Sequence, residues 1–137
     1  LEIGLSRTKQ HSIKRYGMNA EAEIHKIMSA FRKNPVHSIA EQLIVQRNDY
    51  QNGVYERLEG ATWVQVQPPD IPPSNVISWL LQDGDRIIIR PSGTEPKIKF
   101  YFEATLMPQE NDDIDALCDL LDERIDGYLQ SLLSMAH

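Results

Sequence analysis

The sequence contains little cysteine and no long apolar run, and both shortages limit what the protein can be. Its one cysteine, Cys118, cannot form a disulfide within the chain. No apolar stretch approaches the roughly 20 residues that a membrane-spanning helix needs, and the first residues lack the pattern of a secretory signal peptide. We therefore expect a reducing, cytoplasmic setting and no membrane partner.

Positive charge is also in deficit. The 137 residues carry 14 Lys and Arg against 20 Asp and Glu, which gives a formal net charge of −6. A chain of this charge repels the nucleic-acid backbone, so no nucleic-acid partner is expected. Any anion-binding site has to be a local basic area on an acidic body. The length fits one domain whose core needs no disulfide or metal.

Several kinds of catalytic site are missing as well. The histidines share no metal-ligand spacing: His11, His25, His37 and His137. The sequence offers no spacing suited to a Ser-His-Asp triad and no Walker-type loop. Asp83-Gly84-Asp85-Arg86 contains two carboxylates, but its Asp-Gly step between apolar runs predicts a two-residue hairpin turn. The sequence therefore predicts neither a catalytic residue nor a metal ligand.

The most informative segment reads RPSGTEPK over residues 90–97. Arg90 has a planar, permanently charged fork that suits two phosphate oxygens. Ser92 and Thr94 add hydroxyl donors, and Gly93 lets backbone N–H groups approach an anion. Lys97 adds a nearby positive charge. The two prolines stiffen the loop, which lowers the entropy lost when a ligand binds.

A plainer interpretation is that Pro, Ser and Gly here form an ordinary turn with solvated charges beside it. The flanks favour the phosphate interpretation. Residues 87–89 are apolar, and residues 98–102 alternate between apolar and polar, so both ends of the loop are expected to be anchored in a sheet. Binding loops commonly occupy such positions.

The remaining elements follow from periodicity. A helix is predicted from Asn19 to about residue 33, ended by Asn34-Pro35. Residues 43–45 predict a short strand, and residues 48–73 an irregular connection with one brief strand at 62–66. Residues 76–81 and 86–90 predict an antiparallel hairpin. A second helix over 114–133 carries an apolar stripe that includes Cys118, interpreted as a core thiol.

Together these elements predict an α+β fold, with a roughly four-stranded antiparallel sheet packed against two helices. Residues 1–16 show no sustained period and five basic or titratable side chains within 7–16. They are expected to be the tail of a preceding domain and an interdomain linker, which makes the chain a piece of a longer protein. Residues 17–137 would then form the C-terminal domain.

The stretch RPSGTEPKIKFYF, residues 90–102, resembles the phosphate-binding loop of the fourth, C-terminal domain of the alpha-D-phosphohexomutases, which include phosphoglucomutases and phosphomannomutases. The resemblance extends over residues 73–76, the Asp83-Gly84 turn, and a helix end at 27–32 followed by Asn34-Pro35. It covers nearly the whole chain and is strongest to the longer, phosphoglucomutase-like members.

This resemblance implies a specific role. In the family, a phosphoserine on the first domain exchanges a phosphoryl group with a sugar phosphate, and the fourth-domain loop holds the phosphate that is not reacting. Carried over, Arg90, Ser92, Gly93 and Thr94 would contact this phosphate, with Lys97 as an added charge. Glu95 would hold the loop geometry. The expected partners are a hexose 1- or 6-phosphate and the other domains of the same chain.

The resemblance also says what these residues do not supply. The phosphoserine and the Mg²⁺ loop would belong to other parts of a full-length enzyme, because residues 83–86 match only the start of the family's metal loop and lack its third carboxylate. The fragment alone is therefore expected to bind no cofactor and to be inactive. The alternative is a free-standing phosphate- or phosphosugar-binding module that regulates another protein.

Overall fold

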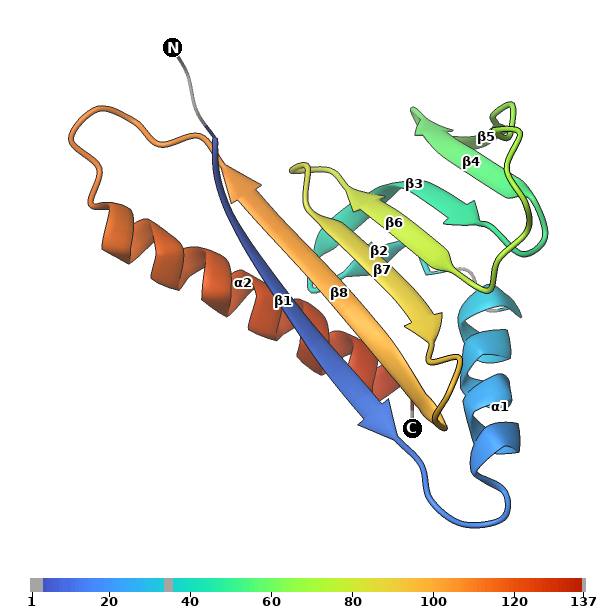
Figure 1. The fold of residues 1–137 in the computed structure, drawn as a ribbon. Coiled ribbons are helices and arrows are strands. Elements are labelled where there is room, and N and C mark those ends of the chain that lie inside the picture. Colours follow the sequence, from blue (N-terminus) through green and yellow to red (C-terminus); the bar gives the residue numbers. More distant parts are fainter. Residues whose placement is uncertain (1–3, 34–35, 137) are drawn as a thin grey trace.

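An antiparallel sheet with two helices on one face forms the fold, which is of the α+β class (Figure 1). The computed structural model describes residues 4–33 and 36–136. The strands are β1 (Leu5–Lys14), β2 (Ser38–Ile39), β3 (Gln42–Asp49), β4 (Val54–Glu59), β5 (Thr62–Gln65), β6 (Ile77–Leu81), β7 (Arg86–Pro91) and β8 (Lys97–Leu106). The helices are α1 (Ala20–Lys33) and α2 (Ile114–Met135). Within the described ranges, neither helix combines the length and the apolar character of a membrane span.

The sheet has eight strands, twice the number that the sequence predicted. Their order is β1-β8-β7-β6-β3-β4-β5, β2 adds to β3, and all neighbours are antiparallel. The predicted hairpin is confirmed as β6 and β7. Its turn is longer than the predicted two residues, because Leu81 N–H donates to the Asp85 carbonyl across residues 82–84. Gly84 closes this turn with a φ of 95°, a conformation that favours glycine.

Strand β1 occupies residues 5–14, where the sequence shows no sustained period and an interdomain linker was expected. It pairs with β8 from Leu5 opposite Leu106 to Lys14 opposite Lys97. The strand was missed because it lies at the sheet edge and its side chains are mostly polar on both faces. On the helix side, Arg7 pairs with Asp122 of α2 through two 3.1 Å contacts where an apolar residue would be expected. The position of any domain boundary stays a prediction.

The β4–β5 hairpin corrects the prediction of an irregular connection over residues 48–73. Only the brief strand near residue 62 was predicted. The rest of the hairpin lacks a clear alternation of apolar and polar residues, because charged side chains that stack and form ion pairs replace apolar packing in this part of the sheet. The Arg47 guanidinium lies 3.7 Å from the Trp63 ring centre, and the same side chain pairs with Glu56 at 3.3 Å. Irregular backbone remains between β5 and β6, at residues 66–76.

The core lies between the helices and one face of the sheet. Alternate residues of β7 and β8 point into it, including Ile87, Ile89 and Phe100, which have no exposed surface. From α1, Phe31 packs edge-on against Trp79 and Phe100, with ring centres 6.1 and 6.2 Å apart. Each such aromatic pair adds about 0.5–1.5 kcal/mol beyond the burial of its area. The predicted end of α1 at residues 34–35 lies outside the described residues.

Helix α2 begins as the sequence predicted. The Asp113 carboxylate caps it by accepting from the backbone N–H groups of Asp115 and Ala116. The apolar stripe is buried only in the later part of the helix, at Leu121, Ile125, Tyr128 and Leu132. Cys118 is half-buried and not the core residue that was predicted. It lies in the first turns of α2, before the first buried residue of the helix, Leu121.

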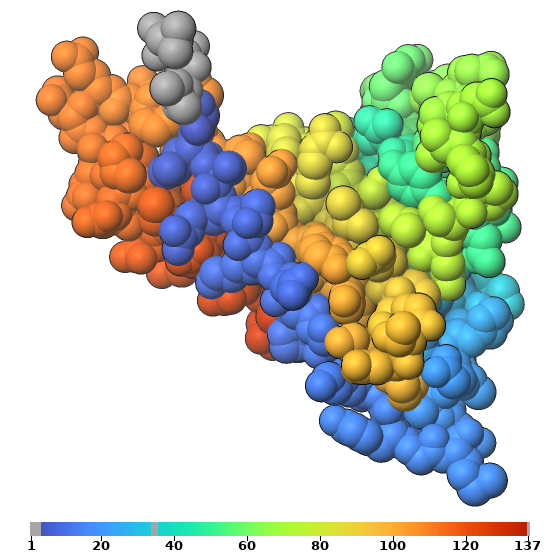
Figure 2. Space-filling model, viewed as in Figure 1, coloured from blue at the N-terminus to red at the C-terminus, as the bar shows by residue number. Residues whose placement is uncertain are grey.

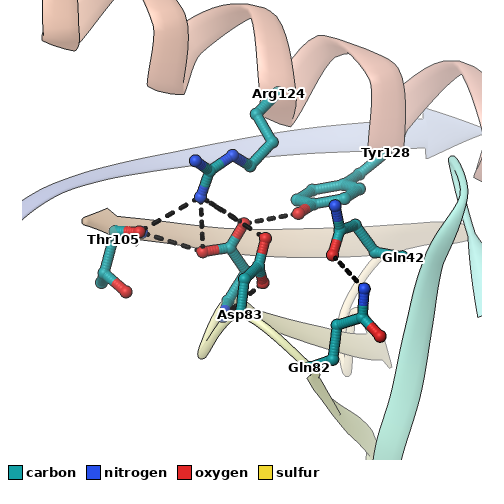
Figure 3. A network of polar contacts seen from close by, with 7 residues as sticks. Gln42, Gln82, Asp83, Thr105, Arg124 and Tyr128 are labelled. Atoms are coloured by element: carbon teal, nitrogen blue, oxygen red, sulfur yellow. Dashed lines mark hydrogen bonds and ion pairs between the residues drawn. The ribbon is translucent and has the colours of Figure 1, made fainter.

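One carboxylate is completely buried beneath α2. Asp85, directly after the β6–β7 turn, has no exposed surface, and both of its oxygens accept hydrogen bonds. Figure 3 shows Thr105, Arg124 and Tyr128 converging on the turn that carries Asp83. Arg124 Nη1 lies 3.2 and 3.1 Å from them, Thr105 N–H donates at 2.9 Å, and the Tyr128 hydroxyl donates as well. Burial, and then the bond to Asp85, raise the pKa of the Tyr128 phenol, which keeps its proton. The network ties the hairpin to β8 and α2.

Candidate phosphate-binding site

The loop over residues 90–97, here called the donor-rich loop, connects β7 to β8 at one end of the sheet. This confirms the prediction that strands anchor both of its ends. Figure 2 shows the sheet face opposite the helices, where the loop lies beside the chain that leaves β1. That neighbouring chain holds the loop in place, since Arg15 N–H donates to the Pro96 carbonyl at 3.0 Å. Ser92 N–H donates to the Lys97 carbonyl at 2.9 Å and closes the loop base.

The inside of the loop is organised by Ser92. Its hydroxyl oxygen accepts from the backbone N–H groups of Thr94 and Glu95, both at 3.3 Å, and lies 3.4 Å from the Thr94 hydroxyl. An oxygen that accepts in this way still has its own hydrogen to donate. Gly93 and Thr94 are exposed at the loop tip. The hydroxyl groups of Ser92 and Thr94 thus lie close to each other and to the backbone N–H groups of Thr94 and Glu95.

Gly93 contributes open space. An added Cβ at this position would meet no atom within 4 Å, and the residue does not adopt a left-handed φ. The fold therefore does not require glycine at position 93. What glycine provides is access to the backbone from outside, which is the property an anion site needs.

Arg90 lies at the end of β7 on the open face of the sheet, as strand alternation from the buried Ile89 requires. Its Nη2 atom donates to the Tyr101 hydroxyl at 3.3 Å, and its guanidinium carbon lies 5.5 Å from the Tyr101 ring centre. Both contacts are exposed and weak. They hold the exposed guanidinium against Tyr101 without burying it.

Lys97 begins β8 and is less available than the sequence suggested. Its amine lies 3.3 Å from the Glu95 carboxylate, and only 18% of its side chain is exposed. Glu95 thus neutralises part of the positive charge in the loop while its N–H bonds to Ser92.

The open face of the sheet is hollowed farther along the strands from the loop, around residues 86–88 and 101–103. A shallow cavity of about 440 Å³ lies over β1, β8 and β7. Its lining includes Gln10, Arg86, Ile88, Tyr101 and Glu103. The cavity lining includes Tyr101, whose hydroxyl accepts a hydrogen bond from Arg90, and it includes no residue of the loop. Lys99 and Tyr101 were not predicted as site residues, although their alternation with buried neighbours placed them together on this face.

The carboxylates of the β6–β7 turn do not form a metal site with one another. Asp85 is occupied by Arg124, Tyr128 and Thr105, and Asp83 lies 3.5 Å from the same arginine. In the described part of the chain, no three His, Cys, Asp or Glu side chains are grouped as metal ligands would be.

The fold is an α+β domain with a loop rich in hydrogen-bond donors at one end of its sheet. Residues 40–119, more than half of the chain, match the family described as "Phosphoglucomutase/phosphomannomutase, C-terminal domain". The chain belongs to this family, as its resemblance to the phosphohexomutases implied.

The chain is also similar to proteins named phosphoglucomutase. The chain is 40% identical to the phosphoglucomutase of Staphylococcus aureus (strain MRSA252) over 85 residues, which are 62% of this chain and 15% of that protein. It is also 40% identical to the phosphoglucomutase of Staphylococcus saprophyticus over 81 residues, 58% of this chain and 14% of that protein. The aligned region thus spans about 15% of the length of these curated relatives.

Proposed function

We propose that the loop over residues 90–97 binds the phosphate group of a sugar phosphate within a phosphoglucomutase-type enzyme. Arg90 supplies a two-pronged cation, Ser92 and Thr94 supply hydroxyl donors, and Gly93 admits the anion to the backbone. Lys97 adds positive charge through its position at the loop base. The observation that carries the proposal is the gathering of these donors, between two strands, in a chain that belongs to this family.

The loop geometry supports weak, reversible binding of a phosphate group. Ser92 is held by two backbone N–H groups, so an arriving phosphate finds its hydroxyl already oriented. Arg90 has only weak contacts with Tyr101 to exchange for charge-assisted ones. The loop therefore needs little rearrangement before it can bind.

In the full-length enzyme, this grip would hold the phosphate that is not being transferred. Binding energy at a remote phosphate orients the reacting sugar oxygen and favours closure of the domain over the substrate. The substrate would be a hexose 1- or 6-phosphate, and the reaction an isomerisation by intramolecular phosphoryl transfer. Magnesium and a phosphoserine would be supplied by other domains, so this chain alone would be inactive. A cytoplasmic location, without nucleic-acid or membrane partners, belongs to the same proposal.

A titration of the chain with inorganic phosphate and with glucose 1-phosphate tests the site. Backbone amide shifts in NMR spectra should be largest at residues 92–95, with weak affinity, because one loop supplies only part of a closed site. Gly93→Ala should fold normally and bind less well, because the new Cβ obstructs the anion. Gly127→Ala in α2 is the matched control, since its Cβ would make only a 3.8 Å contact with Ala40. Largest shifts at residues 82–85 or in α2 would show that the loop is not the site.

The free-standing regulatory module is not favoured by the family match. The two hypotheses differ in what an enzyme assay of the longer protein would show, because only a mutase loses turnover when the loop is altered.

A further inference from the structure

The guanidinium of Arg90 contacts a side chain that lies farther from the donor-rich loop than Arg90 itself. In the register of β7 and β8, Arg90 stands opposite Lys99. Tyr101 stands opposite Ile88, one row farther from the loop. Arg90 Nη2 donates to the Tyr101 hydroxyl at 3.3 Å, and the guanidinium carbon lies 5.5 Å from the ring centre. Among the residues that the structure describes, no side-chain hydrogen bond joins Arg90 to residues 91–97.

The charges around Arg90 explain why its side chain lies on Tyr101. Lys99 stands directly opposite on β8, and like charges at that spacing repel each other. The one carboxylate of the loop, Glu95, lies 3.3 Å from the Lys97 amine. Arg90 itself has no carboxylate within ion-pair distance in the described part of the chain. The hydroxyl of Tyr101 and the negative face of its ring are then the groups that attract the guanidinium.

We propose that Tyr101 is a positioning residue, which holds Arg90 away from the loop until a phosphate group displaces it. This rests on the proposed phosphate-binding function of the loop. Charge-assisted hydrogen bonds to a phosphate are stronger than an exposed contact with a tyrosine, so Arg90 moves to the phosphate when one is present. The contact with Tyr101 is lost in this step. Tyr101 therefore stabilises the phosphate-free state and lowers the affinity of the loop for phosphate.

A lower affinity suits the proposed reaction. The loop would hold the non-reacting phosphate in both orientations of the sugar, so it has to release each phosphate during a turnover. Binding energy that is equal in the ground state and in the transition state does not speed the chemical step. A competing partner for Arg90 reduces such binding and leaves the loop itself unchanged.

NMR signals of the Arg90 side chain test where the guanidinium lies. A tyrosine ring shifts the resonances of protons close to its face. The Arg90 side-chain signals should therefore carry a ring-current shift in the phosphate-free wild-type chain, and this shift should be absent in Tyr101→Leu. During a titration of the wild type with inorganic phosphate, the ring-current shift should disappear with the same dissociation constant as the amide shifts of residues 92–95.

The affinity for phosphate should rise when the contact with Tyr101 is removed. An exposed cation–aromatic contact corresponds to a factor of about two to five in an equilibrium constant, so Tyr101→Leu should bind inorganic phosphate about two- to fivefold more tightly. Tyr101→Phe keeps the ring and loses the hydroxyl, so its affinity should lie between those of wild type and Tyr101→Leu. Gln10→Leu is the matched control, because Gln10 stands opposite Tyr101 on β1 and makes no hydrogen bond with Arg90. It should leave the affinity unchanged.

The outcomes separate the two proposals. If phosphate shifts the amides of residues 92–95 but Tyr101→Leu binds it no more tightly than wild type, the role of Tyr101 is refuted and the loop assignment stands. A ring-current shift that persists at saturation with phosphate also refutes this role, because Arg90 would then stay on the ring. If the wild-type loop does not respond to phosphate, the phosphate site itself is refuted, and the role of Tyr101 with it.

Discussion

Arg90→Ala in the full-length enzyme is the substitution that tests the proposed site most directly. The side chain is exposed at the end of β7, and its contacts are the 3.3 Å hydrogen bond to the Tyr101 hydroxyl and the 5.5 Å approach to the same ring. An exposed cation–aromatic contact contributes about 0.5–1 kcal/mol. The variant should therefore remain folded, with a loss of stability of no more than about 1 kcal/mol.

The loss in activity should be much larger than the loss in stability. Hydrogen bonds to charged groups are worth about 1.5–3 kcal/mol, and the guanidinium would donate to a phosphate in the transition state. A loss of this size lowers kcat/KM by about 10- to 150-fold. Arg90→Lys should recover only part of it, because an ammonium keeps the charge and loses the two-pronged geometry.

The assay is steady-state kinetics with hexose 1-phosphate and with hexose 6-phosphate, together with thermal melting. The defect should appear in both directions, because under the proposed function one loop would hold the non-reacting phosphate in both substrate orientations. Arg57→Ala is the control, since Arg57 is exposed on β4 and pairs only with Glu59 in the described residues. A well-folded Arg90→Ala enzyme with near-normal kcat/KM would refute the proposed role of the loop.

Two further predictions concern stability. Tyr128→Phe should lower the free energy of unfolding by about 1.5–3 kcal/mol, because a buried hydroxyl that donates to the Asp85 carboxylate is lost. Urea denaturation measures this free energy. Tyr16→Phe is the control, because Tyr16 is exposed and its hydroxyl should contribute little. Equal stability of the two variants would contradict the structural role of the Asp85 network. Burial opposes ionisation of Asp49, but hydrogen bonds and the charge of Arg32 outweigh it and lower the pKa of this carboxyl. The ionised Asp49 carboxylate therefore stabilises the fold above its unfolded pKa of about 3.9, and this stabilisation is lost as the pH falls through the lower folded pKa. The difference in unfolding free energy between wild type and Asp49→Asn should shrink below about pH 4. A difference that stays constant with pH would contradict this.

The sequence by itself determined the elements whose signals are local. Helix α2 was predicted from its apolar spacing and its acidic start, and the β6–β7 hairpin from two apolar runs around Asp83-Gly84. The loop at residues 90–97 was also readable, because arginine, hydroxyl and glycine chemistry is concentrated in a few consecutive positions. Such features depend only on residues close together in the chain.

Tertiary structure alone decided the features that depend on distant partners. Strand β1 pairs with β8, and its polar helix-side residues are explained only by Asp122 of α2. Asp85, which reads as part of an exposed turn, becomes fully buried because Arg124 and Tyr128 arrive from another element. Lys99 stands opposite Arg90 only through the register of β7 and β8. Local sequence cannot specify these relations, because strand pairing and burial are set by contacts between residues far apart in the chain.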